Sequence, residues 1–233
     1  MAEKLDTNLY SRQIGTFGME TMGKLIKMNV LIVGMRGLGC ETAKNIILAG
    51  PHEVKIFDNS LTTINDLGGN FYLNEEDVGK TRRDEGSVKK LAELNPYVHV
   101  AVMEGTDILQ KVKEFNVVVI TEIMDLELLY KIDETCRENK IGFIYSAVLG
   151  VSGFVFDDFG KEHFIHDKNG EECKTYLARI ITSDPKECFI TIDDSIGGGK
   201  FALADGDYVT FKEVKGMTEL MMENQEKLGS LTQ

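Results

Sequence analysis

The segment from Asn29 to Gly50 constrains the fold most, because an apolar run is followed there by a glycine-rich turn and an amphipathic stretch. Residues 30–33 read Val-Leu-Ile-Val, and an unbroken apolar run rich in β-branched residues is typical of a strand buried on both faces. Residues 40–49 carry apolar side chains along one stripe before Gly50. This stripe predicts a helix that ends at the glycine.

The turn between the strand and the helix carries three glycines, Gly34, Gly37 and Gly39. A glycine turn in this place lets backbone N–H groups and a helix N-terminus meet a phosphate. The spacing is Gly-x-x-Gly-x-Gly, whereas a dinucleotide dehydrogenase needs Gly-x-Gly-x-x-Gly, so we do not expect NAD binding. Arg36 precedes the second glycine, where its side chain would lie in the space of a nucleotide. The turn therefore resembles a nucleotide site that has been filled in.

Strands and helices alternate along the following residues. Residues 54–58 predict a strand ending at Asp58, where a parallel α/β sheet usually holds a ribose hydroxyl. Further strands are predicted at 98–103, 117–120 and 142–147, and helices at 9–14, 21–28, 81–94, 107–114 and 125–139. This order predicts an α/β fold in which a parallel sheet carries helices on both faces.

The pattern changes after Gly150 to short β-like runs separated by turn signals. We therefore predict a small all-β domain, a barrel or half-barrel, over residues 150–216. Residues 1–149 would form the α/β domain, and residues 217–233 a C-terminal helix over 217–227 with a loose end.

Composition limits the partners and the compartment. The net charge of −12, from 26 basic and 38 acidic residues, argues against nucleic acid and anionic membranes as partners. We also expect no transmembrane helix and no signal peptide. The four cysteines, Cys40, Cys136, Cys173 and Cys188, include no Cys-x-x-Cys pair, which disfavours zinc and suits a reducing compartment. The sequence thus predicts a cytosolic or nuclear protein.

Several patterns imitate functional motifs and are better explained as structure. His163 and His166 would point to opposite faces of a strand, so they do not form a metal pair. Residues 158–160 read Asp-Phe-Gly without the other kinase motifs, and Gly199-Lys200 lacks the rest of a phosphate-binding loop. Cys40 begins a helix, where a thiolate would be stabilised, although packing of a small residue is the commoner explanation. No metal site is expected.

The chain resembles the N-terminal part of a ubiquitin-activating enzyme over almost its whole length. The matching motifs are Leu9-Tyr10-Ser11-Arg12-Gln13, the turn and helix from Gly34 to Gly50, Phe71-Tyr72-Leu73, 76–80, 91–95, 156–160 and 205–220. In that family two ThiF/MoeB-like, Rossmann-like adenylation halves face each other, and only the second binds ATP and magnesium. The resemblance implies that this chain is the first, inactive half followed by the first catalytic-cysteine half-domain.

The resemblance also implies which residues are vestigial. Active halves follow the ribose-binding acid with Ser-Asn-Leu-x-Arg-Gln-Phe, whereas residues 65–71 here read Asn-Asp-Leu-Gly-Gly-Asn-Phe. Gly69 thus replaces a phosphate-binding arginine, and Asn70 replaces a glutamine. Gly34, Gly37, Gly39 and Asp58 would remain as the frame of a site that holds no cofactor, with ATP and magnesium bound in the other half. The thioester-forming cysteine would lie in a later segment.

Arg12 is the one residue to which the resemblance gives a catalytic role. A lone arginine near an N-terminus is usually solvated or salt-bridged. In the family, an arginine here reaches from one half to the γ-phosphate held by the other, a task that suits a planar guanidinium.

The implied partners are the active half, ubiquitin, which the acidic β domain would help to hold, and ubiquitin-conjugating enzymes. The sequence also ends where the family continues, which predicts a truncated chain. The alternative is a separate non-catalytic subunit or binding module, as in activators of small ubiquitin-like modifiers. The β domain inserted before residue 220 favours the single-chain ubiquitin type.

Overall fold

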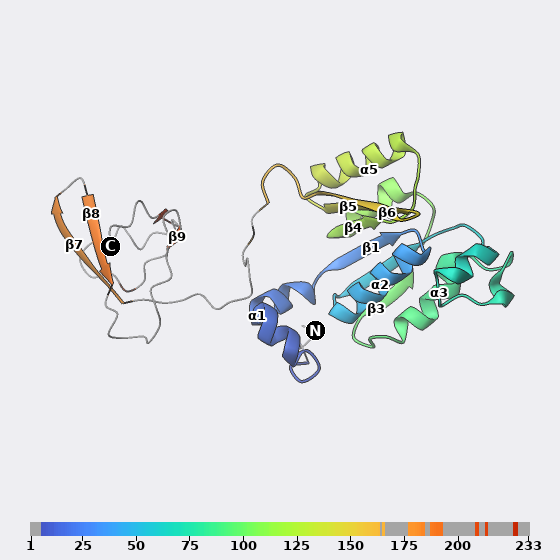
Figure 1. The fold of residues 1–233 in the computed structure, drawn as a ribbon, viewed down its shortest axis with the longest axis horizontal. Helices are drawn as coiled ribbons and strands as arrows, with labels where there is room; N and C mark the ends of the chain where they lie inside the picture. The colour runs from blue at the N-terminus through green and yellow to red at the C-terminus, as the bar shows by residue number, and fades with distance from the viewer. Residues whose placement is uncertain are drawn as a thin grey trace. The chain divides into compact units, whose positions relative to one another are not determined.

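The computed structural model describes residues 6–163, 165, 177–184, 187–192, 208–209, 213 and 226–227. The chain divides into two compact units, Met1–Glu172 and Cys173–Gln233. In the described parts of the chain, no helix is both long enough and apolar enough to cross a membrane. Figure 1 shows the elements of both units.

The first unit is built on one six-stranded sheet in the order β3-β2-β1-β4-β5-β6. Its strands are β1 Asn29–Val33, β2 Glu53–Phe57, β3 His99–Val102, β4 Val117–Ile120, β5 Gly142–Leu149 and β6 Ser152–Asp158. The first five strands run parallel, as predicted, and β6 runs antiparallel to β5. The strand order reverses direction between β1 and β4, the point at which open α/β sheets usually bind ligands.

Helices cover both faces of this sheet, which confirms the predicted fold class (Figure 1). The helical segments are α1 Ser11–Leu25, α2 Gly37–Ala49, η1 Ile64–Gly68, η2 Glu75–Asp77, α3 Arg83–Ala92, α4 Ile108–Lys111, η3 Val112–Glu114 and α5 Leu126–Glu138. One core packs α2 and α3 against the sheet, and the other packs η3 and α5 against it. Along β1, Ile32 enters the first core and Leu31 the second, so both strand faces are buried.

Two predicted N-terminal helices form one element. Helix α1 overlaps both predicted segments, 9–14 and 21–28, and Gly18 breaks its helical conformation with φ 79° and ψ 160°. Met22, after the break, is completely buried. Met22 therefore anchors the part of the helix that follows the glycine kink.

Strand β6 corrects one assignment. Residues 154–156 were predicted to open the small β domain, but they lie in β6, which pairs with β5 from Phe143–Asp158 to Leu149–Ser152. Rings at diagonal positions also pack across this pair, with 5.1 Å between the centroids of Tyr145 and Phe154. The tight connection after β5 returns the chain along the same sheet, so this strand belongs to the first unit.

In the second unit the described residues form two antiparallel pairs. Strand β7 Ala178–Asp184 pairs with β8 Glu187–Ile192, and β9 Tyr208–Val209 pairs with β10 Glu226–Lys227. The prediction of a helix over 217–227 is wrong for its last two residues, because they pair with β9. The remainder of that helix and most of the predicted barrel lie outside the described residues, so the small β domain itself stays a prediction, although residues 152–158 belong to the main sheet.

Candidate functional site

The glycine turn lies where the strand order reverses, at the carboxyl ends of β1 and β4. Val33, the last residue of β1, lies beside Phe57 in β2 and Ile120 in β4. Gly34 adopts φ 94°, a conformation that favours glycine. A Cβ on Gly39 would lie only 1.9 Å from the carbonyl oxygen of Gly34. The turn therefore requires glycine at these positions whether or not a ligand binds there.

The segment that contains η1 closes over this turn. A Cβ on Gly37 would lie 3.3 Å from Cα of Gly69, and a Cβ on Gly69 would lie 3.1 Å from Cα of Gly37, so the two backbones are in contact. Asn70 fastens the segment, because its Nδ2 donates to the Met35 carbonyl and to Ser87 Oγ, each at 2.8 Å. The backbone of this chain thus occupies the approach to the N-terminus of α2, where a phosphate would bind.

The Asp58 carboxylate is bonded to other groups of the protein. Its carboxylate accepts hydrogen bonds from the backbone N–H groups of Met35 at 2.9 Å and Ser60 at 3.0 Å. The guanidinium of Arg83 lies 3.2 Å from Oδ2 of the same carboxylate. Asp58 is also buried, so its oxygens are not available to a ribose.

Arg83 joins Asp58 to a second buried acid, Asp66. Its Nε donates to Asp66 Oδ2 at 2.9 Å, and Asp66 also accepts hydrogen bonds from the backbone and hydroxyl of Thr63. Burial would raise the pKa of Asp66, but the hydrogen bonds from Thr63 and Arg83 outweigh it and lower the pKa. The group is a buried arginine held between two buried carboxylates. It lies at the side of the turn where the ribose would bind.

Arg36 lies at the mouth of the turn, and its side chain is more than half exposed. Its Nε lies 3.2 Å from Glu122 Oε1 and 3.9 Å from Asp66 Oδ1, so it links the end of β4 to η1. Burial is the main cause that raises the pKa of Glu122, although the charge of Arg36 opposes it. Arg36 thus lies at the mouth of the turn, where the sequence analysis expected its side chain to take the space of a nucleotide.

The sequence pattern singled out the glycines, Asp58, Arg36 and Asn70, but not the buried side chains that bond to Asp58. It left Arg82 and Arg83 without a role, and Asp66 and Asp84 were not singled out. Asp84 is completely buried, accepts the backbone N–H of Asp58 at 2.9 Å and pairs with Arg82 at 2.6 Å. An arginine pair at the start of a helix, with acids nearby, was the available signal.

Arg12 lies at the other end of α2 from the turn. Tyr10, two residues earlier, packs on Gly50 just after α2, whereas the turn lies at its start. A helix of 13 residues spans about 20 Å. Arg12 is exposed, and within the described residues no hydrogen bond or ion pair of its guanidinium is found. The structure does not bring Arg12 together with Gly34, Gly37, Gly39 and Asp58.

The other candidate motifs that lie within the described residues are explained by burial or ion pairing. Burial raises the pKa of the Cys40 thiol to about 11 and that of the Cys136 thiol to about 12, so neither is poised as a nucleophile. Asp158 ends β6 and pairs with Arg137 of α5. Within the described residues, no cluster of three metal-ligating side chains occurs. His166 and Gly199-Lys200 lie outside the described residues.

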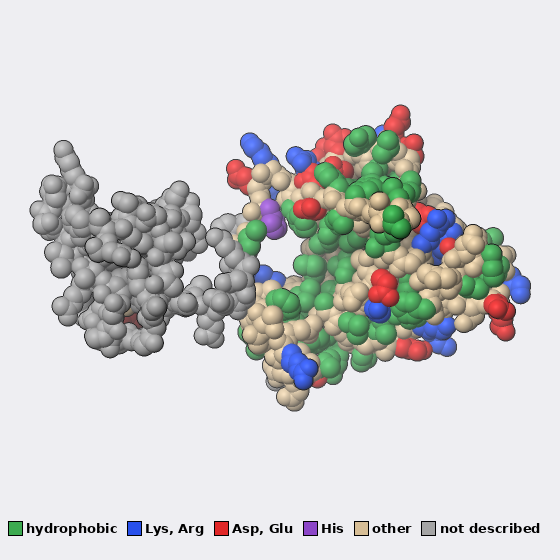
Figure 2. Space-filling view, viewed as in Figure 1, with side chains coloured by type: hydrophobic (Ala, Val, Ile, Leu, Met, Phe, Trp, Pro, Cys, Tyr) green, Lys and Arg blue, Asp and Glu red, His purple; other side chains and the backbone are tan. Residues whose placement is uncertain are grey.

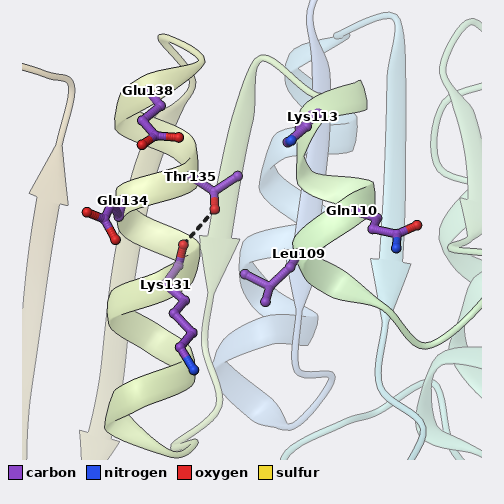
Figure 3. A pocket seen from close by; sticks show the side chains of 7 residues that line it. All are labelled: Leu109, Gln110, Lys113, Lys131, Glu134, Thr135 and Glu138. Atoms are coloured by element: carbon purple, nitrogen blue, oxygen red, sulfur yellow. Dashed lines mark hydrogen bonds between the residues drawn. The ribbon is translucent and has the colours of Figure 1, made fainter.

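A separate surface hollow of about 340 Å³ lies between the 109–113 segment and α5. Figure 3 shows its lining residues, Leu109, Gln110, Lys113, Lys131, Glu134, Thr135 and Glu138. The hydroxyl of Thr135 bonds the Lys131 carbonyl within α5. The lining carries two lysines and two glutamates and includes no residue of the glycine turn.

A Rossmann-like sheet with a glycine turn at the switch point defines a protein of the nucleotide-binding α/β class. Residues 10–179 match the model of the ThiF family, and the chain belongs to this family. A solved structure, "Crystal structure of E. coli MccB + Succinimide", shares the fold with a TM-score of 0.52 and 20% identity, over 60% of this chain and 45% of that one.

Curated relatives confirm the resemblance to ubiquitin-activating enzymes. The chain is 42% identical to "Ubiquitin-like modifier-activating enzyme 1" of Dictyostelium discoideum over 93% of its own length. It is 40% identical to "Ubiquitin-activating enzyme E1 1" of Triticum aestivum and 39% identical to the mouse "Ubiquitin-like modifier-activating enzyme 1", in both cases over 93% of this chain. The chain spans only 20–21% of the length of these relatives.

Proposed function

We propose that this chain is the inactive adenylation half of a ubiquitin-activating enzyme. The whole enzyme would adenylate the ubiquitin C-terminus with ATP and transfer it as a thioester to conjugating enzymes. The main support for this proposal is that the chain's own residues occupy the glycine turn. Asp58 is bonded to Arg83 and to backbone N–H groups, and Gly69 lies against Gly37. With its own site closed, this half would serve as scaffold and docking surface, working in the cytosol and nucleus.

The β5–β6 hairpin favours the proposal that this chain docks onto a large protein partner. The exposed large apolar side chains of this hairpin are Val148, Leu149, Val151, Phe154, Val155 and Phe156. Figure 2 shows hydrophobic side chains reaching the surface of the first unit among charged ones. Large exposed apolar side chains gathered on one hairpin favour a protein interaction site there. We assign this hairpin to contact with the active adenylation half, while the second unit would contact ubiquitin.

Arg12 would then act on the nucleotide of the other half. Its guanidinium is exposed and lies at the far end of α2 from its own turn. A planar guanidinium can donate two bonds to phosphate oxygens and stabilise charge that develops on the γ-phosphate. ATP and magnesium would be held by the active half.

The Arg12→Ala substitution tests this role. In an enzyme assembled from this chain and an active adenylation half, we expect ubiquitin-dependent ATP–pyrophosphate exchange to fall on the order of 100-fold, the typical effect of removing one transition-state donor. Lys24→Ala is the matched control, because Lys24 is an exposed cation of the same helix and pairs with Glu20 on the surface. An unchanged exchange rate for Arg12→Ala would remove Arg12 from the mechanism.

A further inference from the structure

The start of α1 is fastened to the end of α2 by the side chain of Tyr10, which is only 5% exposed. Its ring packs on Gly50, where a Cβ would come within 2.7 Å of ring atoms Cε1 and Cζ. Gly50 also adopts φ 88° as the residue that ends α2. Glycine is thus required here for its backbone conformation and for the approach of the ring.

Asn95 completes this contact from the end of α3. Its Nδ2 donates to the Tyr10 hydroxyl at 2.9 Å and to the carbonyl of Ile47, in the last turn of α2, at 3.0 Å. Its Oδ1 accepts the backbone N–H of Tyr97 at 3.1 Å. The amide is buried, and a buried amide bonded on both sides holds its neighbours in one arrangement.

The fastening is local to the first turn of α1. Before it, Asp6 accepts the Tyr97 hydroxyl at 3.0 Å on the surface. Beyond it, a Cβ on Gly15 or Gly18 would meet nothing within 4 Å, and the helix breaks at Gly18. Tyr10 is thus a buried side chain two residues before Arg12, and it lies before the kink.

We propose that the contact between Tyr10 and Asn95 is a positioning device for Arg12. The inference rests on the proposed function, in which the Arg12 guanidinium meets a phosphate held by another half. Arg12 follows Tyr10 by two residues and is exposed. The buried contact of Tyr10 therefore fixes the backbone position from which the Arg12 side chain extends. A misplacement of about 1 Å at a reacting centre can cost about 100-fold in rate. A fixed backbone position is therefore important for a guanidinium that must reach a phosphate.

The Tyr10→Phe substitution isolates the hydroxyl, because the ring still packs on Gly50 and Asn95 still bonds Ile47. In the assembled enzyme we expect the exchange rate to fall about three- to tenfold, as the loss of one buried hydrogen bond predicts. In the Arg12→Ala background the same substitution should cause no further loss, because Tyr10 acts through Arg12. Tyr130→Phe is the control, since this tyrosine lies exposed on α5, and its rate should stay unchanged.

Hydrogen exchange on this chain alone gives a readout that does not depend on catalysis. Backbone amides at 10–14 should exchange faster in Tyr10→Phe, while those of β1 should keep their protection. An equal loss of rate in both backgrounds, or no loss with Arg12 present, would overturn the positioning role. An unchanged rate in Arg12→Ala would remove the proposed function of Arg12 itself, and the two failures are thereby told apart.

Discussion

Replacing Arg83 with methionine is expected to lower the free energy of unfolding by about 3–5 kcal/mol, the usual cost of removing one partner from a buried ion cluster. Arg83 is 3% exposed and lies between Asp58 and Asp66, each of which is also buried. Without the guanidinium, the two buried carboxylates would keep only Arg36, a cation that is more than half exposed and lies 3.9 Å from Asp66, as compensating charge. Urea denaturation of the 233-residue chain measures the loss.

Lys111→Met is the control for this experiment. Lys111 pairs with Glu114 on the surface, and an exposed pair contributes about 1 kcal/mol or less. Neutralising both acids together with the arginine, as Asp58→Asn, Asp66→Asn and Arg83→Met, should recover part of the stability lost in the single variant. A loss below about 1 kcal/mol for Arg83→Met would show that the cluster does not hold the turn closed.

Gly39→Ala is expected to destabilise the chain by about 3 kcal/mol or more, at the upper end of overpacking effects. The new Cβ would lie 1.9 Å from the Gly34 carbonyl oxygen and 2.7 Å from Oγ1 of Thr121, and the first of these atoms belongs to the backbone. Relief requires α2 to move away from β1, although Ala43 and Ile47 of α2 are completely buried.

Gly68→Ala is the matched control, because a Cβ there would meet nothing within 4 Å. Its free energy of unfolding should change by about 0.5 kcal/mol or less. Thermal unfolding of both variants checks the comparison. Equal stabilities would contradict the close packing of the turn against the helix that follows it.

The sheet could be predicted from the sequence because its central strands are short apolar runs between amphipathic stretches. Residues 30–33 and 117–120 lie in β1 and β4, side by side at the centre of the sheet. Strand β6 was misassigned because the sequence after Gly150 looks like any short β-hairpin, and only tertiary pairing shows that it continues the main sheet. Local pattern identifies a strand but does not say which sheet it joins.

The candidate site was only partly predictable, for a related reason. Glycines and a strand-ending acid follow from local rules, and Gly34, Gly39 and Asp58 lie together as those rules suggest. The pairing of Arg83 with Asp58 spans 25 positions, and the contact of Gly69 with Gly37 is between backbones. The local pattern does not show which distant residue Arg83 or Gly69 contacts.

The glycine turn is closed by the chain's own residues. Titration of ATP with magnesium into the isolated chain in a calorimeter tests this closure, with an active adenylation half as the positive control. Because Asp58 already binds Arg83 and Gly69 covers Gly37, the chain should give no binding heat under conditions in which the active half binds. Saturable ATP binding with micromolar affinity by this chain would show that its own residues do not close the turn.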